Sequence, residues 1–244
     1  KNDPNDNWDS RKKGMVQLFN YYQPDVFGIQ EGMIHQLDYI KSNLKNYDYV
    51  GVARDSGKEI GEFNAIFYDA TKFKIIKQNT FWLSENNIIE KGWDAGFIRI
   101  CTYALLESKT NQSKFWIFNT HLDHEGPTAR EKSVDLILKN IKKLNKHGLP
   151  LVLMGDLNDV PKSNPINVLK SNLDDTFETS KSPAYGPAGT FNGFKTDRVI
   201  TQRIDYIFTS KLKVLNYRHI DDRLDDGGYI SDHLPIFIHT KINK

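Results

Sequence analysis

Cysteine, net charge and long apolar runs are all scarce in this sequence, and each scarcity excludes something. Cys101 is the only cysteine among 244 residues, so a disulfide within the chain is impossible and the redox compartment stays open. The net charge is only +2, whereas a dedicated nucleic-acid binder usually carries a clear basic excess. No run of residues approaches the apolar length of about 20 that spans a bilayer as a helix.

The chain does contain the material for one globular domain. Hydrophobic residues make up 39% of it and charged residues 26%, which is typical of a folded protein with a substantial core. The length suits a single domain, and no internal repeat or linker interrupts it. We therefore expect one soluble, monomeric domain over residues 1–244. Cys101 lies in the apolar run 97–106, which predicts a core position rather than a reactive thiol.

Apolar periodicity predicts interspersed helices and strands, and hence a mixed α/β architecture with more than one sheet. Helical spacing occurs in segments 11–22, 35–44, 128–144 and 164–170. Strand patterns occur in segments 25–30, 47–53, 63–68, 72–80, 98–106, 115–120, 151–154, 204–208 and 235–240.

Polar clusters stand at the ends of five of these strands, where catalytic groups tend to lie. They are Gln30-Glu31-Gly32, Asn119-Thr120-His121-Leu122-Asp123, Gly155-Asp156-Leu157-Asn158-Asp159, Arg203-Ile204-Asp205-Tyr206-Ile207-Phe208 and Ser231-Asp232-His233-Leu234-Pro235. Taken singly, each cluster also has an ordinary structural interpretation, so each is weak evidence.

The first three clusters each suit phosphate or metal chemistry. Glu31 offers the carboxylate oxygen that Mg²⁺ prefers, although a solvated glutamate at a strand end would look the same. His121 is suited to meet a phosphate oxygen, although this cluster also reads as a turn. Asp156 and Asn158 are two residues apart and project to one face of an extended segment. A carboxylate beside an amide suits an attacking water, and an ordinary turn is the alternative.

The last two clusters suggest a buried ion pair and an acid–base pair. Asp205 lies early in an apolar strand, where an unpaired charge would cost several kcal/mol. Its partner is either Arg203 nearby or a residue far along the chain. Asp232 and His233 are adjacent just before the closing strand. We predict that Asp205 and His233 are hydrogen-bonded and that this raises the pKa of the histidine.

The five clusters in this order, QE, NTHLD, GDLND, RIDYIF and SDHLPI, resemble the endonuclease/exonuclease/phosphatase superfamily, whose fold is deoxyribonuclease-I-like. The resemblance covers the chain from about Asp25 to Ile238. It implies a four-layer α/β sandwich in which two packed mixed β-sheets are flanked by helices. It also implies hydrolysis of a phosphoester by an activated water, with Mg²⁺ or Mn²⁺ as the cofactor.

The resemblance assigns roles residue by residue. It implies catalytic roles for His121, Asp156, Asn158, Asp205 and His233. It implies that Glu31 is the main metal ligand, with Asp232 as a second acidic group near the metal. Arg99, Asn158 and His121 are the expected contacts to the substrate. For Arg99 we weighed a surface salt bridge as the alternative.

A more local pattern points to one branch of this superfamily. Segments 81–84, 92–94 and 99–101 resemble an uncharacterised bacterial group that is similar to the deadenylase branch. Trp82 and Trp93 are suited to stack a base or sugar, but a core position is the safer expectation for both. Members of the family begin with a strand ahead of the segment that starts here at Lys1. We therefore expect a further strand upstream beside segment 25–30, and export with removal of an N-terminal segment is one alternative.

Three functions remain open at this point. The first is hydrolysis of a phosphorylated small molecule, as a phosphomonoester or phosphodiester. The second is cleavage of DNA or RNA, which the mild charge does not favour. The third is a non-catalytic binding module, against which the intact acidic and histidine residues argue. Fold alone does not choose between substrates.

Overall fold

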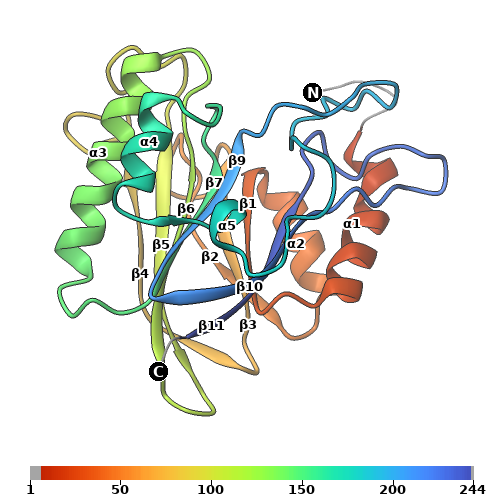
Figure 1. The fold of residues 1–244 in the computed structure, drawn as a ribbon, viewed down its shortest axis with the longest axis horizontal. Helices are drawn as coiled ribbons and strands as arrows, with labels where there is room; N and C mark the ends of the chain where they lie inside the picture. The colour runs from red at the N-terminus through yellow and green to blue at the C-terminus, as the bar shows by residue number, and fades with distance from the viewer. Residues whose placement is uncertain (1–6, 243–244) are drawn as a thin grey trace.

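The computed structural model describes residues 7–242, which form layered sheets and helices (Figure 1). The helices are α1 (Trp8–Tyr22), α2 (Ile34–Asn43), α3 (Pro127–Leu144), α4 (Asn164–Lys170) and α5 (Thr176–Thr179). The strands are β1 (Val26–Gly32), β2 (Tyr47–Val50), β3 (Phe63–Asp69), β4 (Phe73–Trp82), β5 (Ile100–Ser108), β6 (Lys114–His121), β7 (Leu151–Asp156), β8 (Asp174–Asp175), β9 (Asp205–Ser210), β10 (Leu212–His219) and β11 (Ile236–Ile242).

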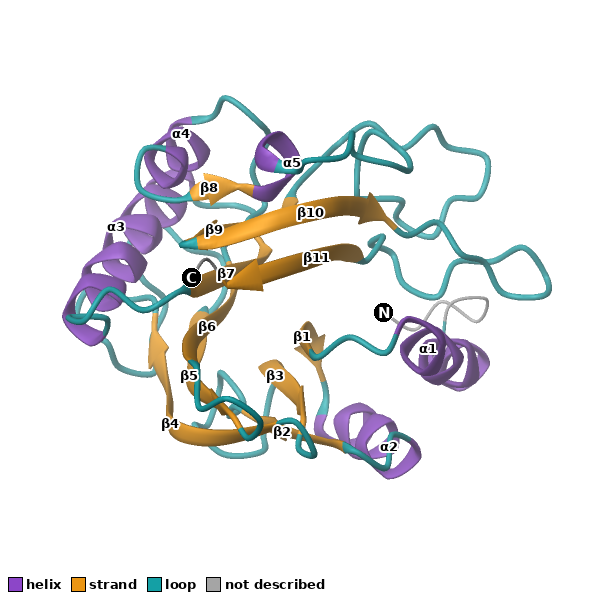
Figure 2. Ribbon diagram, turned by 60° about the horizontal axis from the view of Figure 1, so that its bottom comes forward, coloured by secondary structure: helices purple, strands orange, loops and turns teal. Residues whose placement is uncertain are grey.

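The larger sheet has six strands in the order β4-β5-β6-β7-β9-β8. β6 and β7 pair in parallel, and the other neighbours pair antiparallel. A parallel pair needs a crossover connection, and α3 supplies it on the outer face of the sheet (Figure 2). The apolar side of α3, with Val134, Ile137 and Ile141, is buried in one core cluster with Leu153 and Phe208 of the sheet.

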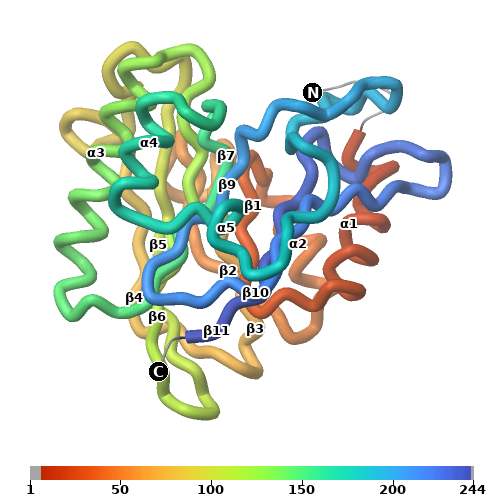
Figure 3. Tube along the Cα trace, in the orientation of Figure 1, coloured from red at the N-terminus to blue at the C-terminus, as the bar shows by residue number. Residues whose placement is uncertain are grey.

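The second layer consists of two antiparallel pieces. One has the order β1-β3-β2, and the other is the pair β10-β11. The helices α1 and α2 cover the outer side of the first piece, where Phe27 and Phe67 stack with ring centroids 4.8 Å apart. Segments far apart in sequence meet here, because the 220–230 segment lies against α1 (Figure 3), where Arg11 Nη1 donates to the Ile230 carbonyl at 2.6 Å.

A core cluster of apolar side chains joins the two layers. Its buried members include Ile66 from β3, Leu106 from β5 and Ile117 from β6. Both faces of these strands are covered, which is why they read as almost continuous apolar runs. Cys101 on β5 is fully buried in the neighbouring core cluster, so its predicted core position is confirmed, and this burial raises the pKa of its thiol.

Asn119 is a polar bridge inside this core, close to the end of β6. Its side-chain amide donates to the carbonyl oxygens of Ile29 at 3.0 Å and Ala65 at 2.8 Å. Its oxygen accepts from Gln30 Nε2 at 2.6 Å. A Cβ atom at Gly28 would lie 2.9 Å from the Asn119 side chain, so glycine allows this approach. These bonds fix the end of β1, and therefore Glu31, relative to the larger sheet.

The predicted α/β class with packed sheets and flanking helices is confirmed, with local differences. The larger sheet is mixed, whereas both pieces of the second layer are antiparallel throughout the described residues. The strand predicted at 47–53 ends at Val50, with only a bridge at Ala53. β10 went unpredicted because Lys213 and Arg218 interrupt its apolar pattern. Among residues 7–242, no helix is long and apolar enough to cross a membrane.

The outer edge of β1 bears on the expected upstream strand. Within residues 7–242, β1 pairs only with β3, and β11 pairs only with β10. An exposed edge leaves backbone donors and acceptors without strand partners. A further strand paired to β1 would satisfy them, and its existence stays a prediction.

Candidate active site

Two neighbouring strands, β6 and β7, end in one row of functional side chains, and the next strand, β9, begins there. In the parallel pair, His121 of β6 stands opposite Asp156 of β7. In the next, antiparallel pair, Asp156 stands opposite Asp205 of β9. Residues opposite each other on adjacent strands project to the same face of a sheet. The register of the sheet therefore brings together three residues that are far apart in sequence.

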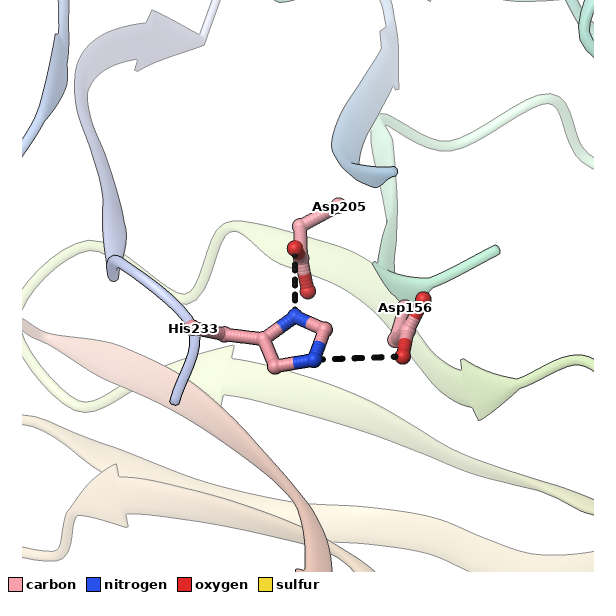
Figure 4. Close-up of side chains that lie close together, drawn as sticks. All are labelled: Asp156, Asp205 and His233. Carbon is pink, nitrogen blue, oxygen red and sulfur yellow. Dashed lines mark hydrogen bonds and ion pairs between the residues drawn. The ribbon is translucent and has the colours of Figure 1, made fainter. Parts of the chain in front are cut away.

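His233 enters the row from the loop before β11. Its Nδ1 lies 2.8 Å from Asp205 Oδ2, and its Nε2 lies 3.8 Å from Asp156 Oδ2 (Figure 4). The predicted hydrogen bond between His233 and Asp205 is confirmed. The loop is held by Asn192, whose side chain donates to the Ser231 carbonyl at 3.0 Å.

The pKa values of His233 and Asp156 are both raised within the row. Burial alone would lower the pKa of His233, but the charges of Asp205 and Asp156 outweigh it and raise the pKa to about 10. Burial and then the nearby charge of Asp205 raise the pKa of Asp156 to about 7. At neutral pH the histidine is therefore a cation, and Asp156 is poised close to its own titration point.

Arg203 does not neutralise Asp205, so that alternative for the strand is wrong. Its guanidinium forms two parallel hydrogen bonds with Asp175, at 3.1 Å and 2.8 Å. Both side chains are almost fully buried, at 5% and 1% exposure. The pairing follows from strand register, because Asp175 of β8 stands opposite Phe208 of β9. Asp205 is left free to bind His233.

Substituting Asp175 with alanine is expected to lower the free energy of unfolding by about 3–5 kcal/mol, because it leaves the buried guanidinium of Arg203 uncompensated. Urea denaturation measures the change. The control is Glu178→Ala, which removes the partner of Lys170 in an exposed ion pair and should cost about 0–1 kcal/mol. Equal losses in the two variants would contradict the prediction.

His121 is enclosed by protein partners. It is 5% exposed, its Nδ1 lies 3.0 Å from Arg99 Nη1, and its Nε2 lies 2.9 Å from the side-chain amide of Asn158 and 3.3 Å from Asp156 Oδ2. A guanidinium only donates, so Nδ1 accepts from Arg99. Burial and then the charge of Arg99 lower the pKa of His121 well below its ordinary value. The ring is therefore neutral, and a direct contact with phosphate requires it to release a partner.

Asn158 continues the row beyond Asp156. Its backbone N–H donates to Asp156 Oδ1 at 2.8 Å, and its side chain also donates to the Leu122 carbonyl at 3.0 Å. The residue has a left-handed φ of 49°, which costs energy in a residue with a side chain. The turn after β7 thus holds the amide beside the carboxylate, as the sequence pattern predicts.

Arg99 is buried, so the expected alternative of a surface salt bridge is wrong. It is 4% exposed and lies 3.4 Å from Asp123, which is itself 1% exposed. Burial opposes ionisation of Asp123, but four backbone N–H groups, beginning with those of Gly126 and Gly96, lower its pKa to about 2. Arg99 holds His121 by donating to its Nδ1. Its predicted contact with substrate stays a prediction.

The two expected metal ligands differ in how closely they approach the row. Glu31 sits at a register shift in β1 with a left-handed φ of 55°, and its Oε1 lies 3.9 Å from His121 Nδ1. Asp232 holds its loop through its backbone carbonyl, which accepts from Asn192 and Gly193. Its charge acts on His233. Within the described residues, no measured contact joins the carboxylates of Glu31 and Asp232.

The donor atoms around the row fit a hard divalent cation. Carboxylate atoms of Asp156 and Asp205 lie within 4.8 Å of each other and of a His233 nitrogen, the Glu31 carboxylate and the Asn158 amide both lie close to His121, and His233, as a cation, is not counted among the ligands. Carboxylate and amide oxygens suit Mg²⁺ or Mn²⁺. A cation would also relieve the repulsion between Asp156 and Asp205 that raises the pKa of Asp156.

Two tryptophans expected in the core are only partly buried. Trp82 donates its Nε1–H to the carbonyl of Arg54 at 2.8 Å. It thereby fixes the loop between β2 and β3 beside the site. Sequence reasoning missed Arg54 and also Phe97, whose ring lies 5.6 Å from the guanidinium carbons of Arg54 and Arg99. Neither residue stands in a polar cluster at the end of a strand, and such clusters are the pattern that predicts site residues from the sequence.

Comparison with known proteins places this site in context. The model of the Endonuclease/Exonuclease/phosphatase family matches residues 2–233. The chain is 36% identical to the mannosyl-6-phosphatase Bt3783 of Bacteroides thetaiotaomicron, with 98% of this chain and 93% of that chain covered and a TM-score of 0.93. It is 28% identical to a functionally unknown conserved protein of Enterococcus faecalis, with 97% and 92% covered and a TM-score of 0.89. The expected likeness to bacterial proteins is thus confirmed.

Other proteins are similar to this chain at lower sequence identity. The chain is 26% identical over 251 residues to the uncharacterised protein L388 of a mimivirus, covering 95% of this chain and 91% of that protein. It is 24% identical to Protein angel of Drosophila melanogaster, covering 83% of this chain and only 59% of that protein. The catalytic domain of human Nocturnin shares the fold, at 22% identity and a TM-score of 0.77 over 97% of this chain and 87% of that one.

Proposed function

The chain belongs to the Endonuclease/Exonuclease/phosphatase family, and from this premise we propose that it hydrolyses the phosphomonoester of a small molecule with a divalent metal ion. The observation that carries the proposal is the row His121–Asp156–Asp205 joined by His233. It sets the His233 cation 3.8 Å from the carboxylate of Asp156. Hydrolysis of a phosphoester needs this combination of positioning and positive charge.

Each residue of the row has a distinct task in the proposed reaction. Asp156 and Asn158 orient a water molecule, and Asp156, whose carboxylate is held by the Asn158 backbone N–H at 2.8 Å, accepts its proton as the general base. The water oxygen forms a bond to phosphorus as the bond to the leaving oxygen breaks, and that oxygen takes a proton from solvent. His233, held by Asp205, donates to the phosphoryl oxygens as negative charge develops on them.

Metal binding is assigned to the oxygen donors of the site. Glu31 is the proposed main ligand, with Asp232 as a second acidic group near it. A bound Mg²⁺ or Mn²⁺ supplies positive charge at the leaving oxygen. His121 and Arg99 set the position of Asn158 and Asp156 through the contacts between them.

The choice of a small phosphomonoester rests on the charge of the chain and on its relatives. The net charge is +2, whereas cleavage of long nucleic acids calls for clustered Lys and Arg along the phosphate path. The 36% identical bacterial neighbour is named for action on a mannosyl 6-phosphate. The second candidate is a nuclease, because proteins with this fold include one solved with a single-stranded DNA product.

A substrate panel tests this proposal. The purified chain is assayed in Mg²⁺ with hexose 6-phosphates, a nucleoside 5′-monophosphate, bis-p-nitrophenyl phosphate, single-stranded DNA and poly(A). We expect the wild type to release inorganic phosphate from at least one monoester. The Asp156→Asn variant should release none, and it therefore controls for a contaminating phosphatase. Faster cleavage of the diester or of either nucleic acid would replace the proposal by the nuclease alternative.

A further inference from the structure

An aromatic pair lies beside the row of catalytic side chains, on the side of Arg99. The rings of Phe97 and His124 stack with centroids 5.3 Å apart. Phe97 is 41% exposed, and the His124 side chain is 50% exposed. An exposed phenylalanine beside a catalytic centre is a surface that can exclude water from a substrate.

The pair is held rigidly by one buried carboxylate. Asp123 accepts hydrogen bonds from the backbone N–H of Phe97 at 3.1 Å and of Gly96 at 3.0 Å. The same carboxylate accepts from the N–H of Glu125 at 3.0 Å and of Gly126 at 2.8 Å. It therefore ties the loop before β5 to the loop before α3, which are the two segments that carry the rings.

The pair is connected to the catalytic row through Arg99. The Nη2 of Arg99 lies 3.1 Å from His124 Nδ1, and its Nη1 lies 3.0 Å from His121 Nδ1. Two side chains, Arg99 and His121, thus lie between the aromatic pair and Asp156. Arg99 therefore contacts both the aromatic pair and the row, and a substrate that binds at the row and extends past Arg99 would meet Phe97.

The rim of the pair carries carboxylates. Glu125 Oε1 lies 3.6 Å from His124 Nε2, and Glu62 Oε2 lies 2.7 Å from Arg54 Nη1 beside Phe97. Carboxylates accept hydrogen bonds from hydroxyl groups. The two guanidinium groups that lie 5.6 Å from the Phe97 ring add hydrogen-bond donors and positive charge. The surroundings therefore offer acceptors and donors beside an exposed ring, which matches a group with an apolar face and several hydroxyls.

We propose that the Phe97–His124 pair, with Glu62 and Glu125 at its rim, binds the leaving group of the substrate and that this group is a sugar ring. This inference rests on the proposed function and specifies its substrate class. The exposed side chain of Phe97 contacts the C–H face of the sugar. The rim carboxylates accept hydrogen bonds from the sugar hydroxyls. Phe97 then sets specificity without touching the reacting phosphorus.

The test compares two monoesters in the wild type and in Phe97→Ala. For a hexose 6-phosphate, the variant is expected to raise KM by about 10-fold with kcat nearly unchanged. For glycerol 3-phosphate, which has no ring, the variant should leave KM unchanged. Phe97→Tyr should restore most of the affinity for the hexose ester. The control Tyr21→Ala removes an aromatic ring that is 80% exposed on α1 and should change neither substrate.

The outcomes separate this inference from the proposed function. If the wild type releases no phosphate from any monoester, the proposed function itself fails. If it is active and Phe97→Ala changes KM equally for the hexose and glycerol esters, the sugar subsite is wrong and the function stands. If Phe97→Ala raised KM more for a nucleoside 5′-monophosphate than for the hexose ester, the assignment to a sugar would be overturned. Thermal denaturation of each variant checks that the loop remains folded.

Discussion

Replacement of His233 by alanine is expected to lower kcat by about 10²–10³-fold, which is the usual cost of removing one preorganised donor to a developing oxyanion. The imidazolium lies 2.8 Å from Asp205 and 3.8 Å from Asp156, so it is positioned before substrate arrives. Steady-state kinetics on the best monoester of the panel measures the loss. The KM should change less than kcat, because the donor acts on charge that appears in the transition state.

A second histidine provides a matched control. His239 lies on β11, is exposed, and bonds to Asn216 at 2.8 Å. His239→Ala should leave kcat unchanged. If His233→Ala lost no more activity than this control, the assignment of His233 to the phosphoryl group would be refuted.

The partner of His233 gives the same prediction a pH dependence. The folded-state pKa of His233 is raised to about 10, so its cationic form, and the activity that needs it, persists at neutral pH and is lost as pH rises through that value. Asp205→Asn removes the charge that raises the pKa. The alkaline limb of the kcat–pH profile should therefore shift to lower pH in this variant. An unshifted limb would contradict the role of Asp205.

Removal of divalent metal is expected to lower activity by about 10³-fold, because a metal ion stabilises charge at a phosphoryl centre by several kcal/mol. Dialysis against a chelator, followed by assay with and without added Mg²⁺ or Mn²⁺, measures the effect. The donors are carboxylates and an amide, and the described residues hold no cluster of cysteine and histidine that would suit structural zinc. Full activity in excess chelator would show that the assignment is wrong.

A substitution of Glu31 is expected to weaken metal binding without removing a group that takes part in the chemical step. Its side chain is 59% exposed and approaches the row only through His121. Glu31→Gln should raise the Mg²⁺ concentration at half-maximal activity, with kcat recovering at saturating metal. Substitution of an exposed glutamate elsewhere, such as Glu178→Gln, should leave the metal requirement unchanged. A loss of kcat that no metal concentration restores would assign Glu31 a different role.

How much of the site the sequence predicts depends on the distance over which each contact acts. Asp156 and Asn158 are two residues apart, and their arrangement after a buried strand was readable from local pattern. The bond between Asp205 and His233 spans 28 positions. It was predicted only because a charge in an apolar strand requires a partner and the order of the motifs indicated one.

For two other residues, the partner considered from the sequence differs from the one in the structure. Arg203 lies two positions from Asp205, yet it binds Asp175 across β8 and β9. Arg99 reads as a residue on an alternating strand, yet it is buried against Asp123. In each case several partners were chemically equivalent, and only the packing of segments distant in sequence selected one of them.

The amino-acid sequence by itself determined the elements and the chemical inventory of this protein. Apolar periodicity and polar strand ends act over a few residues, so they are written locally in the chain. The tertiary structure alone decided which groups share one environment. It aligned His121, Asp156 and Asp205 in one row, raised the pKa values of Asp156 and His233, and placed Phe97 beside Arg99. Burial and charge at a site depend on every segment that packs around it, and no local pattern contains that sum.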